Sequence, residues 1–475
     1  MSTAQRPRAF AAVDLGATSG RVMIGRVGED LLELEQVARF PNGPVRRPDG
    51  LHWDFEALME QVLDGLAEAV RREPSIESIG IDTWAVDYGV LHGAALRAEP
   101  FHYRDDRGAR GVDLVHARVP FAELYARNGL QFLPFTTLYQ LAADDDAGEA
   151  GTVLLVPDLV AHRLTGARVA ERTNASTTGL LGVHDREWDA ALAERIGIGA
   201  DLLPPLVDPG QRIGRLLPAV AARIGADPPV VAVGSHDTAS AVVAAPLASP
   251  SSAYISCGTW GLVGLELDAP VLTDGAREAG FTHELGVDGR IRFLHNVTGL
   301  WLLTETVRAW EAEDGAPIDL PELVARAAAA APGVPVFDAN AESLSAPGDM
   351  PARIAAVVRA NGAEPPPTRA GFVRMIVESI AQAFANAIGT SAELTGRRVD
   401  AIDLIGGGSL NRLLCQTTAD RSGLPVLAGP VEATALGNVL VQARAAGVLG
   451  ADASLEDLRD LVRRTHPPER YAPRR

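Results

Sequence analysis

The sequence contains no lysine, so all 43 of its lysine-or-arginine positions are arginine. P-loop NTPases need a lysine at the β- and γ-phosphates, protein kinases need a strand lysine, and pyridoxal-phosphate enzymes need a lysine for their Schiff base. The absence of lysine therefore excludes all three classes. A nucleotide bound by this chain must be held by backbone N–H groups, hydroxyls, arginine and a metal ion.

The sequence has only two cysteines and no excess of positive charge. The two cysteines, Cys257 and Cys415, lie far apart in buried-looking strand and helix patterns, which favours a reducing compartment over a disulfide framework. A net charge of −18 argues against nucleic-acid and anionic-membrane partners and favours a small-molecule substrate. The N-terminus has no apolar signal core, and no apolar run approaches the ~20 residues of a membrane helix. We expect a cytoplasmic protein.

Strand-like runs alternate with helical stretches along the 475 residues, which predicts an α/β architecture. Proline and serine interrupt this alternation in APLASPSS, residues 245–252. We place the domain boundary there, with an N-terminal lobe over 1–244 and a C-terminal lobe over 245–475. Expected strands are 11–14, 79–82, 86–91, 153–156 and 230–233, and expected helices are 55–71 and 134–143. Apolar residues at helical spacing between Phe372 and Ile388 predict a buried helix face.

The first candidate site is the segment 9–27, an apolar strand that ends in Asp14, a small-residue turn and a second strand that opens with Arg21. Such a turn exposes backbone N–H groups to a phosphate, and the carboxylate can hold a metal through water. The alternative is an ordinary hairpin. A similar strand, turn and strand recur over 253–267 around Gly258 and Thr259, which suggests a duplicated fold with two turns facing a shared cleft, unless the likeness is coincidental.

A second candidate is GSHDTASAVV, where a strand from Val230 breaks at Gly234 and a helix follows that Ser235 can cap. Asp237 would lie in the first turn, where the helix dipole favours its ionised form. It can accept a proton from a substrate hydroxyl, or it can merely support the cap. His236 can contact a sugar hydroxyl, or it can be an ordinary partly buried histidine.

Two glycine-containing turns complete the candidates. Three glycines, Gly406 to Gly408, separate a strand from a helix that we expect to start near Ser409, with Asn411 in its first turn. This arrangement admits adenosine or phosphate to the backbone, although a generic loop is the alternative. In GIDTWAVDYG, small residues beside Trp84 can form a sugar-sized notch or a plain hairpin.

Taken together, these segments resemble the FGGY carbohydrate kinases, and among them the rhamnulokinase branch. The family's order is kept over nearly the whole chain by AVDLGATSGR, GIDTWAVDYG, YRDDR, GLQFLPFTTLYQL, ERTNAST, SHDTASAV, SCGTWGL, NVTGLWLL, LIGGGSLN and AGPVEATALGN. The segment FLPFTTLYQL lacks the lysine of the general family signature, as that branch does. Many short motifs in order are far more specific than any single motif.

The resemblance implies an α/β, two-lobed, actin/hexokinase-like (ribonuclease H-like) duplicated fold with a central cleft that closes over sugar, ATP and Mg²⁺. It implies that Asp237 is the catalytic base and that Asp14 occupies the metal position. The residues that it assigns to the nucleotide are Ala17, Thr18, Ser19, Gly20, Arg21, Thr259, Thr304, Gly407 and Asn411. Those that it assigns to the sugar are Ala85, His236 and Asn296.

Two positions depart from the family pattern. Ala85 stands where the family usually has glycine, and Thr304 stands where it usually has glutamine. Neither departure touches the base, so they bear on affinity and on the choice of sugar. The implied activity is ATP-dependent phosphorylation of L-rhamnulose at its 1-hydroxyl. The alternatives are a sibling kinase for L-fuculose or a pentulose and, from another class, a non-catalytic sugar sensor or chaperone-type ATPase on the same fold.

Overall fold

The computed structural model describes residues 6–144, 151–345, 348–450 and 452–474. The chain forms two compact units. Unit 1 comprises the described residues of Met1–Ala244, Leu267–Arg292 and Ala433–Thr465, and unit 2 those of Ala245–Glu266, Phe293–Glu432 and His466–Arg475. The chain first leaves unit 1 after Ala244, then returns to it twice. Because both units are discontinuous in sequence, the two continuous lobes remain a prediction.

Unit 1 is built on a six-stranded sheet with the order β12-β13-β6-β1-β2-β3. Strand β1 pairs antiparallel with β2 and parallel with β6, so the carboxyl ends of β1 and β6 lie at the same edge. The strands are β1 (Arg8–Leu15), β2 (Ser19–Gly28), β3 (Leu31–Pro41), β6 (Ile76–Thr83), β12 (Arg212–Gly214) and β13 (Val230–Val231). The expected strands 11–14 and 79–82 are therefore present, whereas 230–233 is two residues shorter.

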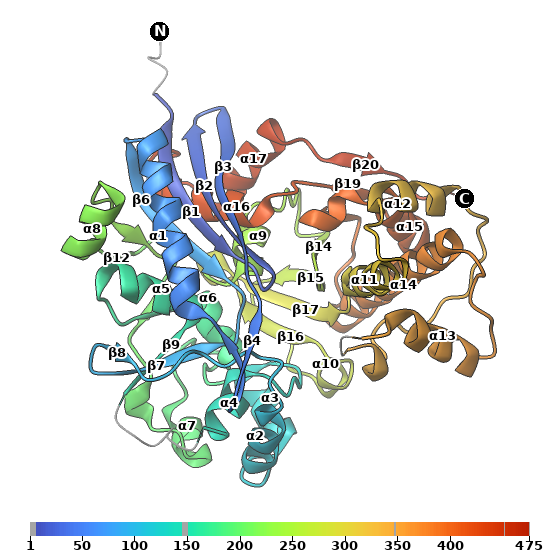
Figure 1. Ribbon diagram of the computed structural model, residues 1–475, viewed down its shortest axis with the longest axis horizontal. Helices are drawn as coiled ribbons and strands as arrows, with labels where there is room; N and C mark the ends of the chain where they lie inside the picture. The colour runs from blue at the N-terminus through green and yellow to red at the C-terminus, as the bar shows by residue number, and fades with distance from the viewer. Residues whose placement is uncertain (1–5, 145–150, 346–347, 451, 475) are drawn as a thin grey trace. The chain divides into compact units, whose positions relative to one another are not determined.

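Helices cover both faces of this sheet (Figure 1). A Cβ added to Gly65 of α1 (Phe55–Arg72) would meet Val22 of β2, whereas a Cβ added to Gly25 of β2 would meet Val439 of α16 (Ala433–Ala445). Val22 and Gly25 are an odd number of residues apart, so they face opposite sides of the strand. Helix α1 therefore packs on one face and α16 on the other.

The rest of unit 1 contains a small sheet with the order β8-β7-β9 and a second core, which includes Tyr88, Leu124 and Tyr139. Helix α4 begins at Thr137 rather than at the expected residue 134, because Thr136 still has extended backbone. The other main elements are β7 (Tyr88–His92), β8 (Ala95–Leu96), α2 (Arg107–His116), α3 (Phe121–Asn128), α4 (Thr137–Ala142), β9 (Thr152–Leu155), α5 (Val156–Thr165), β10 (Ala170–Glu171), α6 (Arg172–Ala175), α7 (Ala190–Ile196), α8 (Pro218–Ile224), α9 (Asp237–Val243) and α17 (Leu455–Thr465).

Unit 2 repeats the strand pattern of unit 1. Strand β14 pairs antiparallel with β15 and parallel with β18, as β1 does with β2 and β6. The strands follow the order β17-β15-β14-β18-β19-β20. Its main elements are β14 (Ser252–Cys257), β15 (Gly261–Leu267), β17 (Ile291–Val297), α11 (Trp301–Asp314), α12 (Leu320–Ala329), α13 (Met350–Ala360), α14 (Arg369–Thr395), β18 (Ala401–Ile405), α15 (Arg412–Ser422), β19 (Val426–Ala428) and β20 (Glu469–Tyr471).

Two sequence expectations are met in unit 2. The apolar stripe of α14 is buried from Phe372 to Ile388, as its helical spacing predicts. Cys257 and Cys415 are both buried and free. Across the described residues of both units, no helix is long and apolar enough to cross a membrane.

Candidate active site

Three chain segments end at one edge of the unit 1 sheet. Asp14 of β1 and Asp82 of β6 are register partners on neighbouring parallel strands. At the end of β6, the N–H of Thr83 donates to the carbonyl of Ser235 at 2.9 Å, and Thr83 bridges to His236. The two strand carboxylates are thereby brought next to the segment that leads into Asp237.

The first turn is fixed by contacts on both sides. Arg21 Nη2 donates to Asp14 Oδ2 at 2.6 Å, and the two residues are register partners of the β1–β2 hairpin. The side chain of Asn42 donates to the carbonyl of Gly16 at 2.9 Å. A Cβ on Gly20 would lie 2.2 Å from the ring of Phe40, so this position accepts only glycine without rearrangement. Between these anchors the turn residues Ala17, Thr18 and Ser19 are partly or fully exposed, as a phosphate loop requires.

Asp82 is the most deeply buried carboxyl at this edge, with no solvent exposure. Asn438 of α16 donates to its Oδ2 at 2.6 Å, and its Oδ1 is a buried oxygen with no hydrogen-bond partner among the described residues. Burial, and next the charge of Asp14, raise the pKa of Asp82 well above its ordinary value. This carboxyl is poised for a cation that would stabilise its charged form.

The residues at this edge fit a magnesium ion. Protein sites usually give Mg²⁺ one or two carboxylates and leave the other positions to water and substrate phosphates. Asp14 and the unpartnered oxygen of Asp82 provide such a pair on adjacent strands. Within the described residues, no group of three or more His, Cys, Asp or Glu side chains is arranged to hold a metal by itself. A bound ion would therefore depend on phosphate oxygens as well.

Asp237 is the first residue of α9, in the first turn as predicted. Its Oδ1 accepts hydrogen bonds from the N–H and hydroxyl of Thr238 at 2.5 and 3.2 Å, while 34% of the side chain stays exposed. The expected cap at Ser235 is wrong. The Ser235 hydroxyl donates to Glu171 and does not cap the helix. His236 is the N-cap residue, and its side chain makes no cap hydrogen bond.

His236 contacts an ion pair formed by Arg292 and Glu284. Arg292, which is fully buried, donates from Nη2 to Nδ1 of His236 at 3.0 Å and lies 3.0 Å from Glu284. Burial raises the pKa of Glu284, but the charge of Arg292 and the contact with His236 outweigh it and hold that pKa below its ordinary value. Nδ1 of His236 also lies 3.2 Å from Oε2 of Glu284, and Nε2 lies 3.4 Å from Oδ1 of Asp237.

Ala85 lies in the turn between β6 and β7, where Asp87 fixes the local structure. One oxygen of Asp87 accepts from the indole N–H groups of Trp53 and Trp84 at 2.6 and 3.0 Å, and the other accepts from Gln140 at 3.1 Å. Burial raises the pKa of Asp87 to about 6. The turn that carries Ala85 is therefore held rigidly, with Ala85 itself partly exposed.

In unit 2, the two remaining turns follow adjacent parallel strands. Ser256 of β14 and Ile405 of β18 are register partners, so the turn at Gly258 and the glycines from Gly406 leave the same sheet edge. Gly406 has φ +82°, and a Cβ there would lie 3.0 Å from the carbonyl oxygen of Cys257. The positive φ and this close approach explain why glycine follows the strand.

The predicted nucleotide residues of unit 2 lie in these turns or in the helices that follow them. The carbonyl of Thr259 accepts from the N–H of Trp301 at 3.1 Å, which fixes the turn to the start of α11. Thr304 lies in the first turn of α11, and both threonines are exposed. The expectation that Asn411 lies in the first turn of a helix is wrong. Asn411 is the N-cap of α15, which begins at Arg412, and its Oδ1 accepts from the N–H of Leu414 at 3.1 Å.

The predicted sugar contacts are divided between the two units. Ala85 and His236 belong to unit 1, whereas Asn296 lies on β17 in unit 2 and is partly buried. Gly407 is exposed in the single turn of 3₁₀-helix that follows β18. The roles of these residues toward sugar and nucleotide remain predictions.

The two halves of the chain match one family. The N-terminal domain of the FGGY family of carbohydrate kinases matches residues 9–244, and its C-terminal domain matches residues 253–446. The chain belongs to the FGGY family. It is 38% identical over 472 residues to a protein named rhamnulokinase from Bacteroides thetaiotaomicron, which covers 98% of this chain and 96% of that protein. A rhamnulokinase from Pectobacterium carotovorum is 39% identical over 471 residues, covering 98% and 92%.

Solved structures of sugar kinases share the fold of this FGGY chain. A ligand-bound xylulose kinase from Lactobacillus acidophilus aligns with a TM-score of 0.79 at 15% identity, over 98% of this chain and 94% of that one. The glycerol kinase of Plasmodium falciparum, solved with ADP, aligns with a TM-score of 0.77 at 14% identity, with the same coverage. The predicted two-part α/β kinase fold is confirmed.

Sequence reasoning gave no role to four residues of this FGGY site. Asp82 had a usable pattern, because IGID before a small-residue turn parallels AAVD before the first turn. Asn438, Glu284 and Arg292 had none. They come from distant segments, and only the folded chain places their side chains against Asp82 and His236.

Proposed function

We propose that this chain transfers the γ-phosphoryl group of ATP to the 1-hydroxyl of L-rhamnulose and so makes L-rhamnulose 1-phosphate. The observation that carries the chemistry is the partly exposed carboxylate of Asp237, set beside His236 at the edge that also bears Asp14 and Asp82. The choice of sugar is supported by near-full-length relatives named rhamnulokinase. No observation favours a sibling sugar kinase or a non-catalytic sensor.

Asp237 is proposed as the general base. Its Oδ1 is occupied by Thr238, and the exposed part of the carboxylate is available to a substrate hydroxyl. It takes the proton of the 1-hydroxyl as that oxygen attacks the γ-phosphorus, while the bond from the γ-phosphorus to the bridging oxygen breaks and ADP leaves. Such a base is worth roughly 10²- to 10⁴-fold in rate. His236, whose Nε2 lies 3.4 Å from Oδ1 of Asp237, is proposed to contact and orient the sugar.

The phosphates are proposed to lie against small-residue turns. In unit 1 the turn Ala17–Gly20 offers backbone N–H groups and hydroxyls, and Arg21 offers its guanidinium. In unit 2, Thr259, Thr304, Gly407 and Asn411 are proposed to contact the nucleotide. A Mg²⁺ ion held by Asp14 and Asp82 would neutralise charge on the phosphoryl oxygens. Positioning and charge stabilisation together account for most of the catalysis of phosphoryl transfer.

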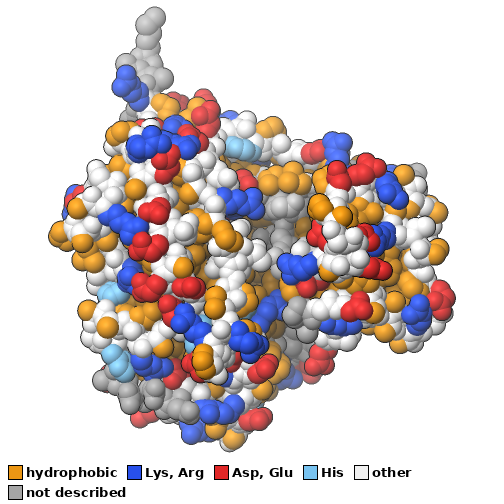
Figure 2. Space-filling view, viewed as in Figure 1, with side chains coloured by type: hydrophobic (Ala, Val, Ile, Leu, Met, Phe, Trp, Pro, Cys, Tyr) orange, Lys and Arg blue, Asp and Glu red, His pale blue; other side chains and the backbone are white. Residues whose placement is uncertain are grey.

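We further propose a cytoplasmic, small-molecule enzyme with no nucleic-acid partner. Two free, buried cysteines agree with a reducing compartment. Arginine and acidic side chains are interspersed on the face shown in Figure 2, with no continuous basic stripe in view. The net charge of −18 points the same way.

A ketose panel tests the proposal. The kcat/KM with MgATP is measured for L-rhamnulose, L-fuculose, L-ribulose, D-xylulose and glycerol. L-Rhamnulose is expected to be the best substrate. A clear preference for another ketose would overturn the assignment of the sugar but leave the kinase, and turnover of none of them would overturn both.

Ala85→Gly, assayed on the same panel, tests the sugar pocket. Removing one methyl group changes the discrimination between substrates by about 1–3 kcal/mol. The variant is expected to lower KM or accept more ketoses while kcat changes by less than about tenfold. An unchanged profile would place Ala85 outside the pocket.

A further inference from the structure

Glu171 is a buried carboxylate outside the machinery described above. It lies at the end of β10, and only 1% of its surface is exposed. Its side chain caps α6: Oε1 accepts from the N–H of Thr173 at 2.8 Å, and Oε2 accepts from the N–H of Asn174 at 3.3 Å. Capping alone would explain these bonds.

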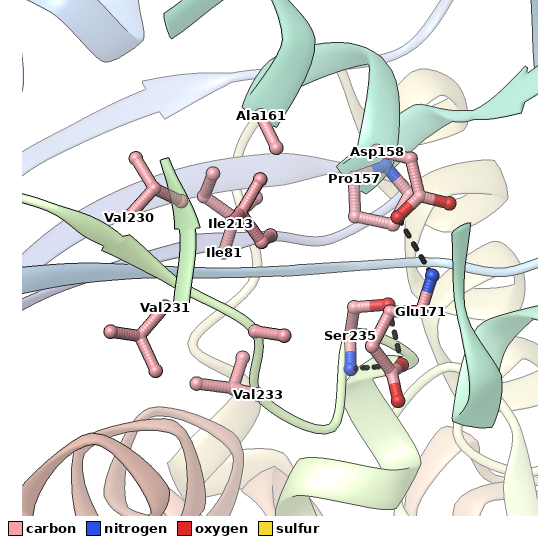
Figure 3. Close-up of a pocket in the computed structure, with 11 residues that line it drawn as sticks. Ile81, Pro157, Asp158, Ala161, Glu171, Ile213, Val230, Val231, Val233 and Ser235 are labelled. Carbon is pink, nitrogen blue, oxygen red and sulfur yellow. Dashed lines mark hydrogen bonds between the residues drawn. The ribbon is translucent and has the colours of Figure 1, made fainter. Parts of the chain in front are cut away.

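A second set of bonds reaches a distant part of the chain. Oε2 of Glu171 also accepts from the N–H and the hydroxyl of Ser235, at 3.0 and 2.8 Å (Figure 3). On its other side, the carbonyl of Ser235 accepts from the N–H of Thr83 at 2.9 Å. Ser235 is thus held between Glu171 and the end of β6, two residues before Asp237.

The surroundings leave room for Ser235 to move if this contact is lost. A small cavity of about 10 Å³ lies beside it, lined mainly by apolar side chains such as Ile81 and Val233 (Figure 3). A cavity of this volume has room for about one water molecule. The segment therefore has space on one side and depends on hydrogen bonds for its position.

Asp158 lines the same cavity and is hydrogen-bonded to the backbone of Glu171. Its Oδ1 accepts from the backbone N–H of Glu171 at 3.1 Å, and its Oδ2 is buried without a hydrogen-bond partner in the described structure. Burial, and next the charge of Glu171, raise the pKa of Asp158 well above its ordinary value. Burial also raises the pKa of Glu171, and the hydrogen bonds from Thr173 and Ser235 act in the opposite direction because they stabilise its charged form.

We propose that Glu171 is a positioning residue for phosphoryl transfer, because its carboxylate sets Ser235 and thereby the placement of His236 and Asp237. The kinetic part of this inference rests on the proposed function, because kcat and KM are measured with ATP and a ketose. A glutamine at 171 has one accepting oxygen and an NH₂ that would face a donor, either Ser235 or the α6 cap. A misplacement of about 1 Å at a reacting group can lower a rate by about 10²-fold.

The test compares Glu171→Gln and Ser235→Ala with a matched control, Glu378→Gln. Glu378 is also a buried carboxylate, bonded to Arg374 and Arg421 on α14 and α15 of unit 2, and has no proposed part in the reaction. For each folded variant, kcat, KM for the ketose and KM for ATP are measured. Hydrogen–deuterium exchange of the amides at 235–237 supplies a readout that does not depend on activity.

Glu171→Gln is expected to lower kcat by about tenfold or more, raise KM for the ketose and leave KM for ATP within about twofold. Amide exchange at 235–237 is expected to speed up. Ser235→Ala keeps the hydrogen bond from the N–H of residue 235 to Glu171 and loses the one from the hydroxyl, so it should show the same changes at smaller size. If Glu171→Gln does not fold, Ser235→Ala alone tests the proposal. Glu378→Gln should keep all three kinetic constants.

Wild-type kinetics and wild-type exchange in the folded variants would overturn the positioning role. A loss of kcat with both KM values unchanged would also overturn it, because a smaller folded fraction gives that pattern. If the wild-type protein phosphorylated no ketose, the proposed function would fail instead, and the exchange experiment would still decide the role of Glu171.

Discussion

Replacing Gly437 with alanine should weaken the protein although alanine is the better helix former. Gly437 lies in α16, where the helix crosses α9 so closely that an added Cβ would be 1.8 Å from the backbone oxygen of Ser240. Ordinary van der Waals contact begins at 3.4 Å, so the helices would have to separate by about 1.6 Å. The atom that is struck belongs to the backbone, and no side-chain rotation relieves the contact.

The expected cost follows from three contributions. Overpacking costs about 1–3 kcal/mol, and the helix propensity of alanine returns about 1 kcal/mol. The next residue, Asn438, would be drawn away from Asp82, and a buried hydrogen-bond partner that is lost costs about 1–3 kcal/mol. We therefore expect a destabilisation of about 1–5 kcal/mol. Because α9 begins with Asp237, kcat should also fall by about 10- to 10²-fold.

Gly389→Ala is the matched control. Gly389 lies in α14 with open space around its added Cβ, so alanine there should stabilise the protein by up to about 1 kcal/mol and leave kcat unchanged. Scanning calorimetry and kcat of both variants make the comparison. If Gly437→Ala were as stable and as active as Gly389→Ala, the close crossing of α9 and α16 would be refuted.

Three further predictions follow from the site. The pKa of about 6 for Asp87 in the folded protein lies above its unfolded value, so ionisation of this carboxyl favours unfolding. Relative to Asp87→Asn, the wild type should therefore lose up to about 3 kcal/mol of stability as pH rises from about 4 to above 6. Urea titrations of both proteins measure this difference in stability, and a difference that does not change with pH would contradict the buried charge. Lysine-acylating reagents should leave activity intact apart from effects at the α-amino group, since the sequence has no lysine, and inactivation would point to a reactive terminus. An arginine-directed dicarbonyl should inactivate the enzyme and MgATP should protect it through Arg21; complete inactivation without protection would place Arg21 away from the phosphates.

Much of the site was predictable because its chemistry lies in short contiguous motifs. The turn after Asp14, the position of Asp237 in a first helical turn and the glycines at 406–408 could all be identified from local patterns. The repeated arrangement of two antiparallel strands and a parallel third is likewise present in both units.

Other features were unpredictable because they depend on distant partners. Serine is a common N-cap residue, so the sequence predicts a cap at Ser235. In the structure its hydroxyl donates to Glu171, 64 residues away in the sequence, and His236 is the N-cap residue. The local pattern predicts Asn411 inside a helix, whereas its side chain accepts from the N–H of Leu414 and makes it the N-cap. Residues such as Arg292 and Asn438 act through long-range contacts that no local pattern encodes.

The most direct test of the proposed mechanism is the turnover of Asp237→Asn. The amide preserves size and the bonds from Thr238 but removes the base, so kcat for L-rhamnulose should fall by roughly 10²- to 10⁴-fold while the Kd for MgATP and the melting temperature stay near wild type. Near-normal turnover by a folded Asp237→Asn protein would contradict the account, because it would remove Asp237 from the reaction and reduce its position on α9 to a structural detail.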